Sequence, residues 1–378
     1  MNVKNTVAEK QEEAFSFQKD NSLLQYLLRI ITDIILKMKD SLNIAIAGAS
    51  GYVGLELIKI LSKHSKAKIL YLCANKSVGK KIYNFDKKII KKNLPKISKI
   101  KNIDWNKINI LFTALPNGEA QKIAKIMPQH IKLIDLSADF RLKDFRLYKK
   151  WYGIKHKCKE LINKSLYAIT EFSRNDLDKH KIISCPGCYP TSIQIPLIPL
   201  IQKKMINVKN IIIDSKSGYS GAGRNLKGKF KFTNIFDSVS AYGVGSHKHL
   251  PEIDQELSKI SKKKIKVFFT PHLIPMFRGI LSTIYVEASG KNNAIKIYKF
   301  LKKYHRKNFF VKISRFNTPI GTGEVMNTNY CNISVCKSRQ KNKIIIISAI
   351  DNLIKGASGQ AVQNMNVAFK LKETLGLI

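Results

Sequence analysis

Acidic residues are scarce in this sequence. Over 378 residues there are 26 Asp and Glu against 67 Lys and Arg, so the formal net charge is +41. A nucleic-acid interface usually clusters its basic residues and interleaves them with aromatic side chains. Here the excess is mostly lysine, is spread along the whole chain and often stands beside isoleucine. We interpret it as a solvated surface shaped by compositional bias, and a basic nucleic-acid-binding protein is the less favoured alternative.

Cysteine and long apolar runs are also rare. Six irregularly spaced cysteines are too few for a disulfide framework in a chain of this length, which indicates a reducing compartment and by default the cytoplasm. The longest apolar stretch near the N-terminus, residues 23–38, contains Arg29 and Asp33 and is shorter than the roughly 20 residues of a membrane span. We therefore expect no membrane association. A hydrophobic fraction of 44% can fill a real core, which excludes a disordered or fibrous protein.

Residues 1–37 differ from the rest of the chain, because their apolar residues have helical spacing and no strand is predicted nearby. Either Met38 is the natural start and this leader is an over-long gene start, or residues 1–37 form an accessory helix.

After Met38, strands and helices alternate. Apolar runs predict strands and helices at 44–47, 53–62, 68–72, 108–113, 119–126 and 132–135. This order is typical of βαβ units in a Rossmann-type, doubly wound sheet. Longer β-rich segments with few helices between them follow residue 188, at 210–215, 266–270, 281–286 and 343–347. They predict a second, α+β domain with a mixed sheet, and helical periodicity returns at 352–375.

A glycine-rich turn, G-x-x-G-x-x-G, separates the first predicted strand from its helix. Gly48 can make the tight turn, Gly51 lets the backbone approach a pyrophosphate, and Gly54 lets helix and strand pack closely. The turn predicts a dinucleotide site formed by Gly48, Ser50, Gly51, Tyr52, Val53 and Gly54.

The end of the second strand lacks the Asp or Glu that would bind the ribose of NAD. Asn75, Lys76 and Ser77 stand there instead, and they offer a cation and small polar groups suited to a 2′-phosphate. The cofactor prediction is therefore NADP(H), and the alternative is that Lys76 is one more surface lysine.

Cys188 follows a predicted strand and a Pro-Gly turn. A helix beginning at Pro190 would place the thiol at a helix N-terminus, where the dipole lowers a thiol pKa and can stabilise an oxyanion. The C-x-x-C formed with Cys185 has no further zinc ligands, because Cys331 and Cys336 stand without a histidine. We expect no metal.

His247 and His249 are candidate proton acceptors for the thiol. If their segment is extended, residues i and i+2 point to the same face. The glycine-rich segment 217–224 ends at Arg224, a cation that could hold an anionic substrate; the alternative is a mobile loop. A cysteine, a histidine and a nicotinamide site together predict hydride transfer to or from a carbonyl bound to the thiol.

The residues from Ile183 to Pro199 resemble the active-site signature of the N-acetyl-gamma-glutamyl-phosphate reductase family, in the semialdehyde dehydrogenase superfamily. Other segments are similar to that family in the same order, at 114–119, 134–142, 216–224, 247–253, 269–276 and 351–366. The resemblance covers the chain from about residue 40 to its end. It implies an NADP-binding domain at 38–187, completed by a C-terminal helix at 350–378, and a catalytic, substrate-binding and oligomerisation domain at 188–349.

The resemblance also implies roles for single residues. Cys188 is the expected nucleophile, and the acid/base is a histidine of the His-Lys-His segment, His249 first and His247 second. Ser137 and Arg141 are expected to hold the phosphate or carboxylate of the substrate; for Arg141 the alternative is an ion pair with Asp139 or Asp144. The stretch that includes Asn352 is expected beside the cofactor.

The implied reaction is the NADPH-dependent reduction of N-acetyl-L-glutamyl 5-phosphate to the semialdehyde, with release of phosphate, in arginine biosynthesis. The implied assembly is a homotetramer or a dimer. Sister enzymes that reduce aspartyl phosphate or an N-acylated aminoadipyl phosphate are the alternative. The sequence departs from the family pattern at Cys185, Asn117 and Asn75-Lys76, and leaves open whether Cys185 bonds to Cys188.

Overall fold

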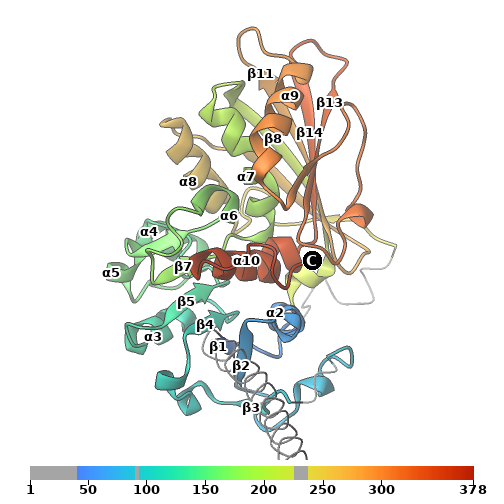
Figure 1. The fold of residues 1–378 in the computed structure, drawn as a ribbon. Helices are drawn as coiled ribbons and strands as arrows, with labels where there is room; N and C mark the ends of the chain where they lie inside the picture. The colour runs from blue at the N-terminus through green and yellow to red at the C-terminus, as the bar shows by residue number, and fades with distance from the viewer. Residues whose placement is uncertain (1–40, 90–92, 225–236) are drawn as a thin grey trace, which may run out of the picture.

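The computed structural model describes residues 41–89, 93–224 and 237–378, and two seven-stranded sheets form its framework (Figure 1). The predictions for residues 1–37 and for a start at Met38 lie outside the described residues.

The first sheet is parallel throughout and has the order β3-β2-β1-β4-β5-β7-β6. Its strands are β1 (Leu42–Ala47), β2 (Ala67–Cys73), β3 (Ile97–Ser98), β4 (Ile110–Thr113), β5 (Lys132–Asp135), β6 (Ser165–Tyr167) and β7 (Ile182–Ser184). The helices of this part are α2 (Tyr52–Lys63), α3 (Glu119–Ile126), α4 (Phe145–Tyr152), α5 (Lys159–Ile162) and α6 (Thr170–Ser173). The predicted doubly wound fold is confirmed.

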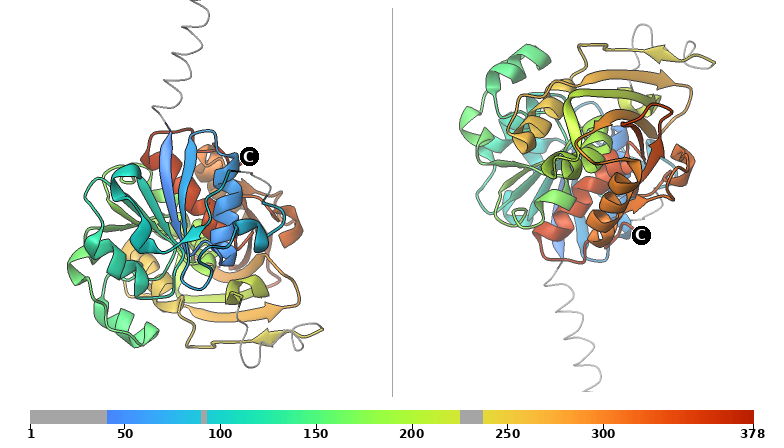
Figure 2. Two further views of the ribbon diagram at one scale, coloured as in Figure 1. Left: turned by 90° about the horizontal axis from the view of Figure 1, so that it is seen from below. Right: turned by 90° about the horizontal axis from the view of Figure 1, so that it is seen from above.

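Helices cover both faces of this sheet. Side chains of α2 share a buried cluster with Ile44 and Ile46, and α3 shares another with Ala45 and Ala47 on the opposite face. Because Ile44 and Ile46 are buried on one face of the sheet and Ala45 and Ala47 on the other, the sequence of β1 is continuously apolar. Figure 2 shows the blue helix α2 and the teal helix α3 on opposite sides of the blue strands. Buried side chains of the C-terminal helix belong to the same cluster as those of α2.

The second sheet is mixed and has the order β12-β13-β14-β11-β8-β10-β9. Its strands are β8 (Ile206–Gly218), β9 (Ser240–Ala241), β10 (Phe268–Ile274), β11 (Ile280–Ala288), β12 (Val311–Ile313), β13 (Cys331–Lys337) and β14 (Lys343–Ile350). Three helices, more than the sequence pattern indicated, share the core of this sheet: α7 (Cys188–Gln202), α8 (Leu250–Ser261) and α9 (Ala294–Tyr304).

Large apolar side chains are exposed on this sheet. Phe268, Ile212 and Tyr285 are 63%, 48% and 42% exposed, and they occupy paired positions on the neighbouring strands β10, β8 and β11. An exposed apolar stripe of this kind marks an interaction surface.

The chain then returns to the first sheet. A π turn, η9 (Ile354–Ser358), leads into α10 (Gly359–Ala368), which packs with α2 and lies between the two sheets in Figure 1. Short 3-10 turns complete the described elements: η1 (Ile82–Asn84), η2 (Ile100–Asn102), η3 (Trp105–Lys107), η4 (Tyr219–Ala222), η7 (His305–Lys307) and η8 (Thr322–Glu324). Among the described residues, no helix combines the length and apolarity of a membrane span.

Candidate active site

The glycine turn forms a tight backbone cradle at the N-terminus of α2. Gly48 has a φ of +93°, and a Cβ atom there would lie 2.2 Å from the carbonyl oxygen of Ala114. A Cβ at Gly54 would lie 2.2 Å from the carbonyl oxygen of Gly48, so both positions require glycine. Gly51 caps α2 without a side-chain hydrogen bond, and no acidic residue stands in the first helical turn. The amides of Tyr52, Val53 and their neighbours therefore suit a pyrophosphate.

The predicted 2′-phosphate residues follow β2 at the same edge of the sheet. β1 and β2 are parallel neighbours, so the turn at Ser50 and the segment after Cys73 lie side by side. Asn75 and Lys76 are exposed, whereas Ser77 is buried. The two exposed side chains are open to a ligand that lies across the ends of the strands.

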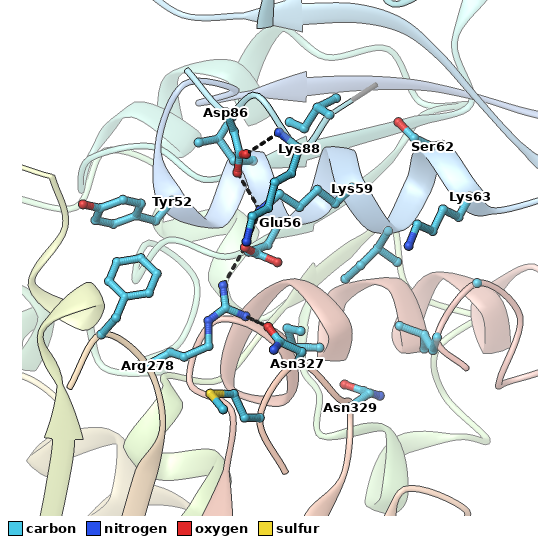
Figure 3. Close-up of a pocket in the computed structure, with 18 of the residues that line it drawn as sticks. Tyr52, Glu56, Lys59, Ser62, Lys63, Asp86, Lys88, Arg278, Asn327 and Asn329 are labelled. Atoms are coloured by element: carbon cyan, nitrogen blue, oxygen red, sulfur yellow. Dashed lines mark hydrogen bonds and ion pairs between the residues drawn. The ribbon is translucent and has the colours of Figure 1, made fainter. Parts of the chain in front are cut away.

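A cavity of ≈ 1340 Å³ runs along α2 from Tyr52 towards Lys63, between this helix and the segments that carry Arg278 and Asn327 (Figure 3). Arg224 lines its Tyr52 end, where its guanidinium donates to the carbonyl oxygen of Phe85 at 3.2 Å and lies 5.1 Å over the Tyr52 ring. On the opposite side of the cavity, Arg278 forms an ion pair with Glu56 of α2 at 2.7 Å. The structure thus places Arg224 beside the glycine turn.

Cys188 is the first residue of α7, so the helix begins two residues before the predicted Pro190. Gly187 caps it without a side-chain hydrogen bond. Burial raises the pKa of the Cys188 thiol to about 11, although the charge of Arg141 and a backbone hydrogen bond from Tyr189 act in the opposite direction. The expected lowering of the thiol pKa by the helix terminus was therefore wrong, because desolvation of the thiolate is larger.

The two histidines lie in a turn that leads into α8, so the condition of an extended segment is not met. Their rings nevertheless lie 4.8 Å apart. His247 packs against Tyr189 and Tyr242, and its Nδ1 accepts the backbone N–H of His249 at 3.1 Å. His249 lies against Gly187, where an added Cβ would come within 2.4 Å of Nε2. His249 is therefore the imidazole next to the start of α7.

Both imidazoles are neutral near pH 7. Burial lowers the pKa of His247 to about 4, and the charge of Lys248 acts in the same direction. Burial, together with His247 and Arg141, lowers the pKa of His249 well below its ordinary value. Nδ1 of His249 is buried and has no hydrogen-bond partner among the described residues. A neutral imidazole in this position can accept a proton.

Arg141 belongs to a buried polar network around Gly187. Its Nε donates to the carbonyl oxygen of Cys185 at 2.8 Å, and its Nη1 lies 3.6 Å from Glu252. Glu252 in turn accepts the N–H of Gly187 at 2.7 Å and the hydroxyl of Tyr167 at 2.8 Å. The ion pairs with Asp139 or Asp144 considered for Arg141 were wrong. Glu252 was missed by the sequence argument, although it stands only three residues after His249.

Ser137 is buried, and both its hydroxyl and its backbone N–H are hydrogen-bonded inside the protein. Its hydroxyl donates to one oxygen of Asp135 at 2.9 Å and its N–H to the other at 2.9 Å. Burial and the neighbouring Asp139 raise the pKa of Asp135 to about 6. Of the two predicted substrate residues in this stretch, only Arg141 reaches towards the start of α7.

The C-terminal segment closes the site from the other side. Asn352 is buried, accepts the N–H of Gly279 at 2.7 Å and donates to the hydroxyl of Ser220 at 2.9 Å. Gly356 lies against Cys188, because a Cβ atom there would be 2.7 Å from Cys188 Cβ. Asn352 thus links the C-terminal segment to the segments that carry Ser220 and Gly279.

All six cysteines are free thiols. Cys185 belongs to the core of the first sheet and faces the amide of Asn364 at 3.7 Å. In the part of the chain that the structure describes, no three His, Cys, Asp or Glu side chains gather as a metal site would require.

Two family models match the chain in order. Residues 43–180 match the semialdehyde dehydrogenase NAD binding domain, and residues 188–352 match the semialdehyde dehydrogenase dimerisation domain. These matches support a nicotinamide dinucleotide cofactor, a small-molecule substrate and oligomerisation of the chain.

Solved structures share the fold at low sequence identity. Aspartate semialdehyde dehydrogenase II of Vibrio cholerae superposes with a TM-score of 0.68 at 17% identity, over 87% of this chain and 98% of that chain. Aspartate semialdehyde dehydrogenase of Candida albicans, solved with NADP, gives a TM-score of 0.62 at 15% identity, over 87% and 99%.

Curated relatives are closer in sequence. A probable chloroplastic N-acetyl-gamma-glutamyl-phosphate reductase of Oryza sativa subsp. japonica is 42% identical over 342 residues, covering 90% of this chain and 82% of that protein. The N-acetyl-gamma-glutamyl-phosphate reductase of Ehrlichia canis (strain Jake) is also 42% identical, over 90% of this chain and 98% of that protein. With both domains matched in order and this identity over most of its length, the chain belongs to the N-acetyl-gamma-glutamyl-phosphate reductase family of semialdehyde dehydrogenases.

Proposed function

We propose that the chain reduces N-acetyl-L-glutamyl 5-phosphate to N-acetyl-L-glutamate 5-semialdehyde, with release of phosphate, in arginine biosynthesis. The observation that carries this proposal is the meeting of a thiol and a neutral imidazole at one helix terminus. Cys188 begins α7, and His249 lies on Gly187 immediately before it. The identity of the substrate in this proposal is taken from the names of the relatives.

In the first step, Nε2 of His249 accepts the proton of the Cys188 thiol. The sulfur attacks the acyl carbon, a C–S bond forms, and the bond from that carbon to the phosphate oxygen breaks. The products are a thioester on Cys188, inorganic phosphate and a protonated His249. A thiol with a pKa of about 11 is almost entirely protonated at pH 7, so this step needs the imidazole.

In the second step, the thioester carbon is reduced. The bound dinucleotide supplies the hydride. The C–S bond then breaks, the semialdehyde leaves, and the proton on His249 returns to the Cys188 sulfur. His247 holds His249 in place through the hydrogen bond from the backbone of His249, and Arg141 is the proposed cation for the anionic substrate.

NADP(H) is the proposed form of the cofactor. Support comes from the exposed Lys76 and Asn75 at the end of β2, where no acidic residue stands, and from the uncapped N-terminus of α2. The proposed cofactor residues are Gly48, Ser50, Gly51, Tyr52, Val53, Gly54, Asn75, Lys76, Ser77 and Asn352. Arg224 lies beside Tyr52 and is better placed for the cofactor than for a substrate on Cys188.

The proposed assembly is a homotetramer or dimer built on the apolar stripe of the second sheet, formed by Ile212, Phe268 and Tyr285. We divide the chain into an NADP domain at 38–187, completed by 350–378, and a catalytic and oligomerisation domain at 188–349. Six free thiols support a reducing compartment such as the cytoplasm.

The test is the reverse reaction, phosphate-dependent reduction of NADP, followed with three semialdehydes in parallel. N-acetylglutamate semialdehyde should be oxidised, and aspartate semialdehyde and an N-acylated aminoadipate semialdehyde should not. Cys188→Ser should abolish the reaction. Turnover of Cys188→Ser at the wild-type rate, or a preference for another semialdehyde, would overturn the assignment.

A further inference from the structure

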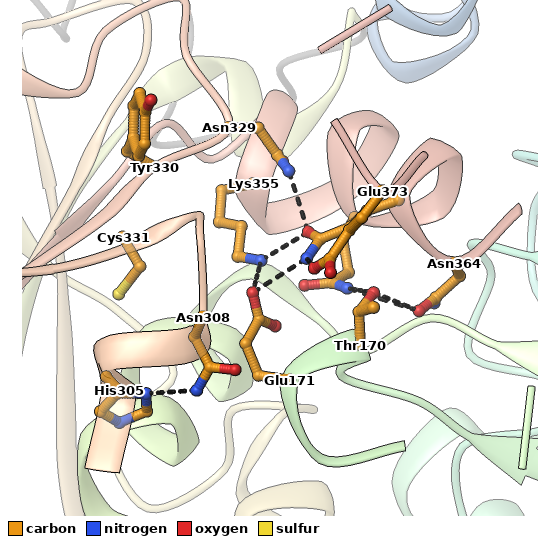
Figure 4. Close-up of polar contacts among 12 residues, drawn as sticks. Thr170, Glu171, His305, Asn308, Asn329, Tyr330, Cys331, Lys355, Asn364 and Glu373 are labelled. Carbon is orange, nitrogen blue, oxygen red and sulfur yellow. Dashed lines mark hydrogen bonds and ion pairs between the residues drawn. The ribbon is translucent and has the colours of Figure 1, made fainter. Parts of the chain in front are cut away.

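A fully buried lysine lies where the two sheets meet. Lys355 in η9 has no exposed surface, and its Nζ donates to Oε1 of Glu171 at 2.7 Å and to Oε1 of Gln363 at 2.8 Å (Figure 4). Lysine is almost never fully buried unless it is paired. Its partner Glu171 is equally buried as a side chain and comes from α6, 184 residues earlier in the sequence.

The pair is the centre of a network that joins both parts of the molecule. Gln363 donates to Glu171 at 3.0 Å and to Glu373 at 2.7 Å, and Asn329 donates to Gln363 at 2.9 Å. Gln363 lies on α10, whose buried side chains belong to the core of the first sheet, whereas Asn329 lies just before β13 of the second sheet. The network therefore fixes the two sheets relative to η9.

Glu171 is held in its ionised form. Burial by itself would raise the pKa of Glu171, but the charge of Lys355 and hydrogen bonds from Lys355 and Gln363 outweigh it, so the pKa is lowered. Removing two charges from water is costly, and a buried ion pair is often no more stable than apolar side chains of the same size. Stability alone therefore does not account for this pair.

The backbone next to Lys355 is in close contact with Cys188. The side chain of Lys355 points to Glu171, and the following residue, Gly356, faces Cys188 so closely that an added Cβ would lie 2.7 Å from Cys188 Cβ and 3.2 Å from its Cα. π turns within helices are rare and occur frequently at functional sites. Any movement of η9 would be transmitted directly to the nucleophile.

We propose that Lys355 is a positioning residue, whose ion pair with Glu171 holds η9 against the start of α7 and so fixes Cys188 for attack. The proposal rests on the proposed function of Cys188. It predicts that loss of the pair lowers the rate of thioester formation without weakening binding of the cofactor.

The test compares Lys355→Met, Glu171→Gln and the double variant Lys355→Met/Glu171→Met. Each single variant leaves one buried charge unpaired and should melt at a lower temperature. The double variant has neither charge and should recover most of the lost stability. Its kcat should nevertheless stay at least about tenfold below wild type, with KM for NADPH changed by less than about twofold. The exposed pair Lys122–Glu119 on α3 provides the matched control, Lys122→Met/Glu119→Met.

A second measurement needs no substrate. The rate at which iodoacetamide alkylates Cys188, followed by peptide mass spectrometry, should change at least about fivefold in the double variant and stay unchanged in the control. If wild type oxidises none of the three semialdehydes, the proposed function fails, but the alkylation comparison still tests the positioning of Cys188. A double variant with wild-type kcat and alkylation rate would overturn the proposal.

If the double variant does not fold, Lys355→Arg and Glu171→Asp carry the same comparison, because they keep both charges and displace the pair. A lower kcat and an altered alkylation rate at an unchanged melting temperature support the proposal. Wild-type values of both overturn it.

Discussion

Nε2 of His249 lies directly over Gly187, the residue before Cys188. A Cβ atom at Gly187 would approach that nitrogen to 2.4 Å, well inside van der Waals contact. Gly187 has a φ of −66° and a ψ of 158°, a conformation that any residue adopts. A side chain at this position would therefore displace the imidazole without straining the backbone.

Gly187→Ala should lower kcat at least about tenfold, because a misplaced general base loses most of its effect. Binding of NADPH, measured by fluorescence titration, should be unchanged. Gly321→Ala is the control, since a Cβ at Gly321 meets no atom within 4 Å and its φ is −127°. A Gly187→Ala enzyme with wild-type kcat would contradict the placement of His249.

The pKa of Cys188 predicts how the free thiol reacts. Burial raises this pKa to about 11, so the thiolate fraction at neutral pH is small and grows as pH rises. The rate of iodoacetamide alkylation at Cys188, in enzyme without cofactor or substrate, should increase continuously from about pH 7 to 10. A plateau below about pH 8.5 would show a thiolate already formed by the helix terminus.

Arg141 stabilises a buried carboxylate. Arg141→Met leaves Glu252 unpaired, and the free energy of unfolding should fall by about 3 kcal/mol. Adding Glu252→Gln should recover part of this loss, because it removes the uncompensated charge. Urea denaturation measures both effects. Arg146→Met is the control, since the Arg146 side chain is 81% exposed and its ion pair with Asp144 contributes about 0.5 kcal/mol at most. Equal losses in the two Met variants would refute the role of Glu252.

The apolar stripe on the second sheet predicts the interface between subunits. Phe268→Asp should shift the assembly towards monomers in sedimentation velocity, because it buries a charge between two copies. Phe268 is 63% exposed, so the fold of the single chain should be unaffected. Ile126→Asp on α3 is the control at a similarly exposed position, 68%. An unchanged sedimentation coefficient for Phe268→Asp would exclude this face.

His305 makes the protein less stable in acid. Burial lowers its folded pKa to about 4 from an ordinary 6.5, so between these values the unfolded chain binds a proton that the folded chain does not. The free energy of unfolding therefore falls as pH decreases through this window. Between about pH 7.5 and pH 5, His305→Gln should lose about 2 kcal/mol less than wild type in urea denaturation.

The exposed His130 provides the control for this measurement. His130→Gln shows what a histidine-to-glutamine change does at an exposed position, and it should not reproduce the effect of His305→Gln. A His305→Gln profile parallel to wild type would contradict the burial of His305.

Local sequence was sufficient for much of the fold and for the position of the site. The elements predicted between residues 44 and 135 differ from the observed bounds by a few residues at most, because apolar periodicity and glycine spacing act over short distances. The short elements β3, β6, α4, α5 and α6 were not predicted. The glycine turn and Cys188 at a helix start were predicted in the same way, although α7 begins earlier than Pro190.

Only the tertiary structure decided how the chemical groups are paired and how far they are buried. Glu252 as the partner of Arg141, the raised pKa of Cys188 and the contact of His249 with Gly187 all arise between segments far apart in the sequence. The desolvation of a charge depends on everything packed around it, and no local pattern contains that information. For the same reason the ion pair between Lys355 and Glu171, which are 184 residues apart, could be identified only from the tertiary structure.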